Sequence, residues 1–211
     1  MKADISHDDP STGSEGGAAI RRLVVLAAPS GAGKTTIAHR LLERHVGWRF
    51  SVSATTRPQR QGERQGIDYH FLDRAEFERR IAEGDLVEYE EVFGNLYGTL
   101  RSEIRQAMAQ ESFERMIFDV DVKGALSLRR AFPDDTFLCF IAPPSKEILG
   151  ERLRARKTET PESIAIRLAR VDMEMAVAHE FDAIVVNDLL ERAVMEIEGY
   201  VERGMPRRDA R

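Results

Sequence analysis

The chain has 211 residues, of which 42% are hydrophobic and 32% are charged, so it can bury a core of ordinary size. This composition excludes a wholly disordered protein and a small disulfide-stapled scaffold. The formal net charge of -5 argues against a general nucleic-acid binder and against a protein that binds anionic membranes.

The two ends of the chain have the composition of solvated tails. Residues 1–20 are rich in Asp, Ser and Gly and contain no apolar block, which predicts a disordered tail and no secretory signal. Residues 203–211 predict a second tail. The single cysteine, Cys139, cannot pair within the chain, and the five histidines lack metal-ligand spacing. We therefore expect a cytoplasmic protein without a structural metal.

Between the tails, short apolar runs alternate with helical patterns. Residues 23–28 predict a buried strand, and from Thr35 onward apolar residues recur at helical spacing. The runs at 116–122, 136–142 and 183–187 repeat the strand signature, and each is followed by an amphipathic pattern. Buried strands that alternate with helices indicate an α/β fold with a parallel sheet covered on both faces.

Residues 49–99 interrupt this alternation. The segment is polar and contains short β-like pieces near 50–53, 69–71 and 86–92, so we interpret it as a subdomain inserted into the α/β core. A second irregular and strongly charged stretch, residues 154–162, lies between two predicted helices.

The sequence APSGAGKT, residues 28–35, lies between the first strand and the first helix and predicts a phosphate-binding loop. Glycines allow backbone N–H groups to approach the phosphates, the helix N-terminus adds its dipole, and Lys34 can reach the β- and γ-phosphates. The Thr35 hydroxyl can bind Mg²⁺. Ala28 replaces the first glycine of the general pattern, and alanine fits there because Pro29 drives the preceding residue to negative φ. We expect the phosphates of a nucleotide donor, which the family resemblance described next implies to be ATP, at these residues: Ala28, Pro29, Ser30, Gly31, Ala32, Gly33, Lys34, Thr35 and Thr36.

Further motifs make the chain resemble the guanylate kinase family. They read SVSATTRPQR, GIDYHF, VEYEEVFGNLYGT, DVDVKG, RLRARKTET and IVVND, and they follow the order and approximate spacing of the family from about residue 22 to residue 201. The resemblance implies a five-stranded parallel P-loop sheet flanked by helices, with a small mixed β insert that binds GMP and a helical lid. It implies one domain over residues 21–202, with a core at 21–48, 100–151 and 168–202, the insert at 49–99 and the lid at 152–167.

The resemblance also implies ATP:GMP phosphotransfer, in which the insert and the lid close over the two nucleotides. Guanidinium groups bind phosphate bidentately and tyrosine hydroxyls complete such a site. The family pattern assigns the phosphate of GMP to Arg57, Arg60, Tyr69 and Tyr97. It assigns guanine, whose N1–H and N2–H₂ groups both donate to one carboxylate, to Glu88 with Ser53 and Thr99 as hydroxyl partners.

Two aspartates follow the strand predicted at 116–122. Asp119 is the candidate for the Mg²⁺ shell, through water, and Asp121 resembles the family's aspartate near the acceptor nucleoside. For one of the two, capping the following helix is the alternative. Asn187 is predicted to meet the adenine of ATP, with capping of the last helix as its alternative.

The family's lid arginines match Arg152, Arg156 and Arg167, whereas Arg154 and Lys157 are expected to be solvated. With Lys34 and Arg57, these three would carry the transfer. Three residues depart from the family pattern: Leu96 for an aromatic residue or histidine, Lys123 for glutamine, and Lys157 for glycine. The alternatives to an enzyme acting on GMP are a guanylate kinase-like binding module and a P-loop kinase with another phosphorylated acceptor.

Overall fold

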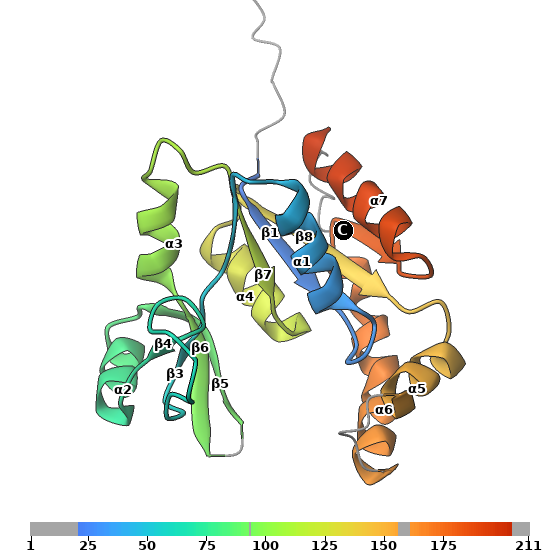
Figure 1. Ribbon diagram of the computed structural model, residues 1–211, viewed down its shortest axis with the longest axis horizontal. Coiled ribbons are helices and arrows are strands. Elements are labelled where there is room, and N and C mark those ends of the chain that lie inside the picture. Colours follow the sequence, from blue (N-terminus) through green and yellow to red (C-terminus); the bar gives the residue numbers. More distant parts are fainter. Residues whose placement is uncertain (1–20, 93, 156–160, 204–211) are drawn as a thin grey trace, which may run out of the picture.

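The computed structural model describes residues 21–92, 94–155 and 161–203 (Figure 1). The predicted tails at 1–20 and 203–211 lie outside these ranges apart from Arg203. Within them, no helix has the length and apolar character needed to cross a membrane.

A five-stranded parallel sheet forms the centre of the molecule, with the strand order β2-β7-β1-β8-β9. The predicted fold class is therefore confirmed. The strands are β1 (Leu23–Ala27), β2 (Trp48–Phe50), β7 (Arg115–Asp119), β8 (Thr136–Ala142) and β9 (Ala183–Val186).

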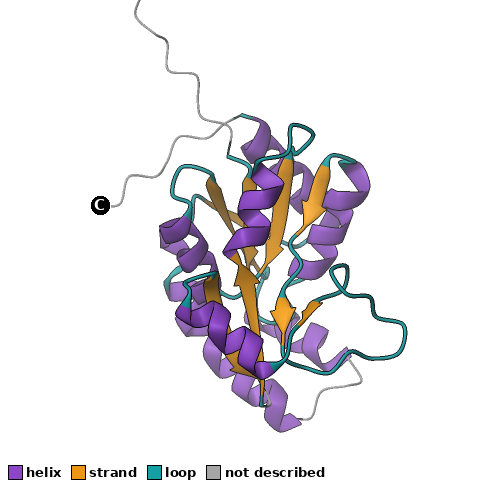
Figure 2. Ribbon diagram, turned by 90° about the vertical axis from the view of Figure 1, so that its left-hand side faces the viewer, coloured by secondary structure: helices purple, strands orange, loops and turns teal. Residues whose placement is uncertain are grey.

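Helices cover both faces of this sheet because its central strands are apolar on both sides (Figures 1 and 2). Along β1, Val24 and Leu26 pack into one cluster with α1 and α7, while Leu23, Val25 and Ala27 pack into the other with α3 and α4. The helices are α1 (Lys34–Arg44), α3 (Arg101–Met108), α4 (Val122–Ala131), α5 (Lys146–Ala155), α6 (Pro161–Ala176) and α7 (Leu190–Glu202), with a 3₁₀ turn at Ala178–Glu180.

The insert forms a separate four-stranded mixed sheet with the order β4-β3-β6-β5. Its own small core contains Ala54, Phe77, Leu96 and Leu100. Its elements are β3 (Ala54–Thr55), β4 (His70–Phe71), α2 (Arg74–Ala82), β5 (Leu86–Val92) and β6 (Asn95–Leu100).

One boundary differs from the sequence prediction. Arg49 and Phe50 were expected in the insert, but they pair with Met116 and Ile117 of β7 and form the edge of the main sheet. The β-structure of the insert therefore begins at Ala54. Trp48 anchors the edge strand because its side chain is buried against the main sheet, whereas the next two residues are exposed.

Candidate functional site

The phosphate loop connects β1 to α1 at the carboxyl edge of the main sheet, where ligands bind in open α/β folds. Gly31 and Gly33 both have positive φ, 92° and 96°, a conformation that favours glycine. Both are also tightly packed. A Cβ on Gly31 would lie 2.9 Å from Leu153 of α5, and a Cβ on Gly33 would lie 2.3 Å from the side-chain nitrogen of Asn187. The glycines are therefore required by conformation and by contact.

The predicted ATP residues surround a cavity of about 310 Å³ at this loop. Asp119 and Glu174 complete its wall. Ala32 does not line the cavity; it is buried, and its carbonyl oxygen accepts hydrogen bonds from behind the loop. The lining residues from the loop and the start of α1 are Ala28, Pro29, Ser30, Gly31, Gly33, Lys34, Thr35 and Thr36.

Lys34, Thr35 and Asp119 form one hydrogen-bonded group. The Lys34 Nζ lies 2.6 Å from Asp119 Oδ1 and also donates to the carbonyl oxygen of Val120. The Thr35 hydroxyl donates to Asp119 Oδ2 at 2.5 Å. The end of β7 therefore holds the lysine and the threonine of the loop in place.

The side chains of Thr35 and Asp119 in this group indicate whether Mg²⁺ fits beside the phosphate loop. Thr35 and Asp119 offer a hydroxyl and a carboxylate side by side, which is the pair that holds Mg²⁺ in P-loop enzymes. Within the described ranges, no three His, Cys, Asp or Glu side chains are grouped closely enough to chelate a metal by themselves. This donor set fits Mg²⁺, which keeps several waters and takes further oxygens from nucleotide phosphates.

Three predicted residues, Arg152, Arg167 and Asn187, form hydrogen bonds with the phosphate loop. The Arg152 guanidinium donates to the carbonyl oxygens of Asn187 at 2.9 Å and Ala32 at 3.5 Å, and Arg167 donates to the Ser30 hydroxyl. Asn187 is buried, and its amide donates to the carbonyl of Ala32 at 2.7 Å.

The alternative role for Asn187, capping the last helix, is wrong because Leu189 occupies the N-cap of α7. The adenine contact of Asn187 stays a prediction. Arg156 lies outside the described residues.

The acceptor side is built on the insert. The Arg57 guanidinium forms a bidentate pair with the carboxylate of Glu63, and its face lies over the rings of Tyr69 and Phe71 at 5.3 and 5.7 Å. Tyr69 and Tyr97 make an edge contact at 6.1 Å between ring centroids. The Arg60 side chain is exposed.

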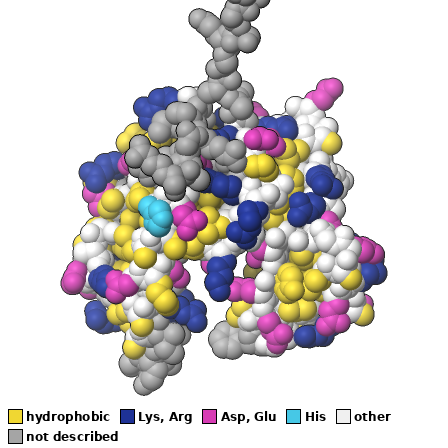
Figure 3. Space-filling model, turned by 180° about the vertical axis from the view of Figure 1, so that it is seen from behind, with side chains coloured by type: hydrophobic (Ala, Val, Ile, Leu, Met, Phe, Trp, Pro, Cys, Tyr) yellow, Lys and Arg dark blue, Asp and Glu magenta, His cyan; other side chains and the backbone are white. Residues whose placement is uncertain are grey.

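A cavity of about 520 Å³ brings the two sides together. Lys34, Asp119 and Asp121 line it from the core, and Ser53, Tyr69, Glu88 and Tyr97 line it from the insert. Seen from behind, the surface is hollowed between the insert and the remainder of the chain, and Lys or Arg side chains lie along the hollow (Figure 3). Predicted donor and acceptor residues therefore share one cavity, although Arg57, Arg60 and Thr99 are not among its lining residues.

Glu88 lies on β5 and accepts a hydrogen bond of 2.6 Å from the hydroxyl of Thr99 on β6. Burial raises the pKa of the Glu88 carboxyl above its ordinary value. The negative charges of Asp121 and Glu90 raise this pKa further, and the Thr99 hydrogen bond opposes the increase. Burial removes water from this carboxylate and so disfavours its charged form. Two hydrogen-bond donors, such as those of guanine, would stabilise the charged form again.

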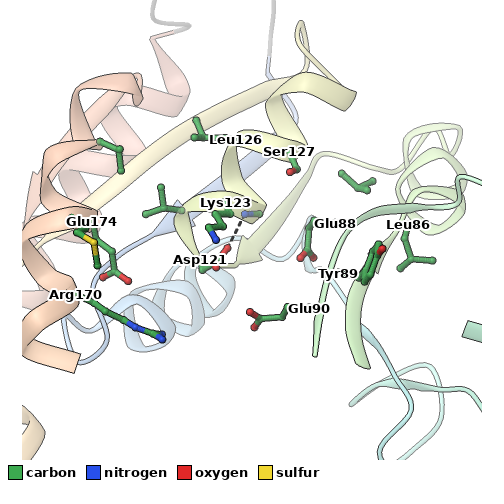
Figure 4. Close-up of a pocket in the computed structure, with 15 residues that line it drawn as sticks. Leu86, Glu88, Tyr89, Glu90, Asp121, Lys123, Leu126, Ser127, Arg170 and Glu174 are labelled. Carbon is green, nitrogen blue, oxygen red and sulfur yellow. Dashed lines mark hydrogen bonds between the residues drawn. The ribbon is translucent and has the colours of Figure 1, made fainter. Parts of the chain in front are cut away.

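Asp121 lies where the cavities of the site meet. Its carboxylate caps α4 by accepting the backbone N–H of Gly124 at 2.7 Å, so the capping alternative holds for this aspartate. Asp121 also lines both cavities described above and a larger one of about 920 Å³ between β5, α4 and α6. Figure 4 shows this larger cavity, with Glu88 and Glu90 on the side of the insert and Arg170 and Glu174 on the side of α6.

The comparison with known proteins agrees with this geometry. The sequence profile of guanylate kinase matches residues 20–204. The chain belongs to the guanylate kinase family. It is 52% identical over 175 residues to the guanylate kinase of Chlorobium luteolum, covering 83% of this chain and 88% of that protein. It is 54% identical over 177 residues to the guanylate kinase of Salinibacter ruber, covering 83% and 93%.

A crystal structure of the guanylate kinase of Anaplasma phagocytophilum has the same fold. It is 30% identical, with a TM-score of 0.66, and the match covers 90% of this chain and 89% of that one. The resemblance noted from the motifs is thus confirmed for the family and the fold.

The three departures from the guanylate kinase pattern have different surroundings. Leu96 is buried in the core of the insert, where an apolar side chain fits. Lys123 is exposed at the start of α4 and lines the larger cavity beside Asp121 (Figure 4). Lys157 lies outside the described residues.

Sequence reasoning missed two acidic residues of this guanylate kinase site. Glu63 pairs with Arg57, six residues earlier in a polar loop, and no regular spacing in the sequence indicated this pair. Glu174 on α6 lines the loop cavity and the larger cavity, and burial raises the pKa of its carboxyl. No local pattern could have placed Glu174, because it comes to the loop through the packing of α6.

Proposed function

We propose that the chain transfers the γ-phosphoryl group of Mg-ATP to GMP, giving GDP and ADP, with the residues assigned above. The observation that carries the proposal is the shared cavity, in which Lys34 of the phosphate loop faces the guanine-type carboxylate Glu88 and the tyrosines of the insert. A phosphate loop alone would support any nucleotide donor. The carboxylate of Glu88 across the cavity supports guanine as the base of the acceptor.

On the donor side, the loop N–H groups and Lys34 would hold the phosphates of ATP. Mg²⁺, held through Thr35 and Asp119, would neutralise charge on the β- and γ-phosphates. Arg167 already contacts Ser30, which lines the loop cavity, so its guanidinium is near the phosphates that it would stabilise. Arg152 contacts the loop from behind, at the carbonyl of Ala32, and is proposed to join Arg167 when the nucleotide is bound.

On the acceptor side, Arg57, Arg60, Tyr69 and Tyr97 would bind the phosphate of GMP. Glu88 would accept the N1–H and N2–H₂ groups of guanine, with Ser53 and Thr99 as further partners and Asp121 nearby. Adenine presents an acceptor where guanine presents N1–H, so adenine would leave Glu88 unpaired.

The transfer itself needs position and charge neutralisation rather than a covalent enzyme intermediate. An oxygen of the GMP phosphate attacks the γ-phosphorus while the bond from that phosphorus to the bridging oxygen of ADP breaks. Lys34 and the arginines stabilise the charge on the transferred group. Arg156 would join them from the lid at 152–167, in a domain divided as the motifs predict.

A coupled assay of nucleotide conversion tests the proposal. The purified protein with Mg-ATP should convert GMP to GDP at least a hundredfold faster than it phosphorylates AMP, CMP or UMP. Folded protein without GMP-dependent turnover would contradict the activity, and removal of Mg²⁺ by a chelator should abolish turnover.

Lys34→Ala tests the donor site. Transfer should fall by about 10²–10³ because one charged donor at the developing charge is lost, while GMP binding persists. Lys146→Ala is the matched control, since Lys146 forms a solvent-exposed pair with Asp172 and lines none of the cavities described above. Normal turnover of the Lys34 variant would show that the donor site is elsewhere.

We also propose a cytoplasmic location, where Mg-ATP is supplied to such a phosphotransferase. Fractionation of cells that express the chain should recover it with the cytoplasmic enzymes. Recovery in a membrane or secreted fraction would contradict this location.

A further inference from the structure

The carboxylate of Glu63 binds the Arg57 guanidinium through its two terminal nitrogens, Nη1 and Nη2. Glu63 Oε1 accepts from Arg57 Nη2 at 2.8 Å, and Oε2 accepts from Nη1 at 3.1 Å. Nη1 also donates to the carbonyl oxygen of Pro58 at 2.8 Å. Both side chains are largely shielded from water, with 12% of Arg57 and 21% of Glu63 exposed. Bidentate pairs of this kind fix the plane of the guanidinium as well as its place.

The same carboxylate also fixes the turn between the two arginines. Glu63 Oε2 accepts the backbone N–H of Arg60 at 2.8 Å, and the side chain of Gln59 donates to the backbone carbonyl of Glu63. Glu63 is thus tied to its own loop independently of Arg57. The pair with Arg57 lowers the pKa of the Glu63 carboxyl, and the Arg60 N–H lowers it further, so Glu63 is charged at neutral pH.

These contacts leave one edge of Arg57 for a ligand. A guanidinium has five N–H groups. Glu63 and Pro58 occupy both N–H groups of Nη1 and one of Nη2. The Nε–H and the second N–H of Nη2 remain for a phosphate. The rings of Tyr69 and Phe71 limit rotation out of this plane.

We propose that Glu63 is a positioning residue for the acceptor phosphate. It holds Arg57 against Tyr69, whose side chain lines the shared cavity, before GMP binds, and it stays paired while GMP is bound. The charge of Glu63 by itself repels phosphate, so its benefit comes from geometry: Arg57 loses less side-chain freedom when GMP binds. This inference rests on the proposed function, because it assigns the phosphate on Arg57 to GMP.

The first experiment compares Glu63→Gln with Glu78→Gln in steady-state kinetics. Glu78 also pairs with an arginine of the insert, Arg74, but both side chains are more than half exposed and lie on α2. We expect Glu63→Gln to raise KM for GMP about tenfold, with kcat and KM for ATP within twofold of the original. Glu78→Gln should change none of these values.

The second experiment separates positioning from loss of the loop structure. Equilibrium binding of GMP and of guanosine is measured by calorimetry on Glu63→Gln, with thermal unfolding as the check that the insert is folded. GMP should bind about tenfold more weakly and guanosine equally well, because guanosine has no phosphate for Arg57. An equal loss of affinity for GMP and for guanosine would overturn the inference. Tighter GMP binding would also overturn it, because it would mean that the GMP phosphate displaces Glu63 from Arg57.

A double variant tests whether Glu63 acts through Arg57. In Arg57→Lys, the bidentate geometry is already lost, so adding Glu63→Gln should weaken GMP binding by less than twofold more. A full tenfold further loss would overturn the inference. Absence of GMP binding by the unaltered protein would instead refute the proposed function, and the inference with it.

Discussion

The side-chain amide of Asn187 donates a hydrogen bond of 2.7 Å to the carbonyl oxygen of Ala32, joining the end of the edge strand β9 to the phosphate loop. Arg152 adds a hydrogen bond from α5 to the backbone carbonyl of Asn187. The loop is therefore held from behind by elements far away in the sequence, and its front is left to the nucleotide.

This packing makes Gly33 a sensitive position. Gly33→Ala would place a Cβ 2.3 Å from the Asn187 nitrogen, in a conformation that costs an alanine about 1–2 kcal/mol. We expect ATP affinity to fall at least about tenfold, measured by calorimetry, with a lower Tm.

Gly84→Ala is the matched control for Gly33→Ala. Gly84 also has positive φ, but a Cβ there would meet nothing within 4 Å. Gly84→Ala should lower Tm and leave ATP affinity unchanged. Equal losses of ATP affinity in the two variants would show that the contact with Asn187 is irrelevant.

Glu88→Gln should reduce the choice of guanine over adenine. The amide can still accept from Thr99, but it cannot accept both guanine donors as the carboxylate does, so the ratio of kcat/KM for GMP to that for AMP should fall about 10–100-fold. Glu91→Gln is the control on the same strand, because Glu91 is exposed and pairs with Arg74. An unchanged ratio in Glu88→Gln would assign guanine to another residue.

The raised pKa of Glu88 predicts a pH dependence for GMP binding. As pH falls through this pKa, the carboxyl becomes neutral and loses its capacity to accept both donors. We expect kcat/KM for GMP to decline on acidification at a higher pH than an ordinary glutamate would produce. Glu88→Gln should lack this decline, and a pH profile identical to that of the original protein would contradict the assignment.

The raised pKa of the Glu88 carboxyl also makes the folding stability depend on pH. A carboxyl whose pKa is higher in the folded state binds more protons there than in the unfolded state, so its stabilising contribution is present below the ordinary pKa and is lost as pH rises through the raised pKa. Glu88→Gln should therefore raise Tm at neutral pH and have little effect at pH about 3, well below the ordinary pKa. Thermal unfolding at the two pH values measures the difference.

The sequence predicted the parts of this molecule that depend on local pattern. The strands at β1, β7, β8 and β9 are apolar on both faces, and the glycines of the loop stand between a strand and a helix, so periodicity and spacing were enough. Arg49 and Phe50 of the edge strand β2 were assigned to the insert because the segment from residue 49 onward is polar, and the structure shows both residues exposed. Its place in the main sheet depends on pairing with β7, which has no local signature.

The contacts that support the site were harder to predict. The pair of Arg57 and Glu63 spans six residues of a polar loop, a spacing that belongs to neither helix nor strand. The bond from Asn187 to Ala32 spans 155 positions and depends on the parallel order of the strands. Motif resemblance named the candidate nucleotide-binding residues, whereas the hydrogen bonds that hold them, such as those of Glu63 and Asn187, required coordinates.

Asp182→Asn should be the most destabilising polar change away from the site. Its carboxylate is 1% exposed, lies 3.1 Å from Arg21, also pairs with Arg129, and accepts the backbone N–H of Leu138 at 2.8 Å. Removing its charge breaks the ion pairs of this carboxylate with Arg21 and Arg129, whose side chains are 13% and 20% exposed, so the free energy of unfolding should fall by about 3–5 kcal/mol in urea titration.

Asp172→Asn is the control for Asp182→Asn. Asp172 is 69% exposed and pairs with Lys146 at the surface, so this change should stay within about 0.5 kcal/mol. Similar losses in the two variants would show that burial of Asp182 does not determine its contribution.

The division into two sheets has a consequence for how this enzyme can change over time. The insert sheet shares no strand with the main sheet, and the chain leaves the main sheet at Phe50 and finishes the insert at Leu100. Substitutions that reshape acceptor recognition can therefore accumulate in one sheet while strand register beneath the phosphate loop stays fixed. If the proposed function holds, acceptor choice can change largely through the insert while donor chemistry is retained, and the insert, together with Asp121 of the shared cavity, is the part to alter when redesigning which monophosphate is accepted.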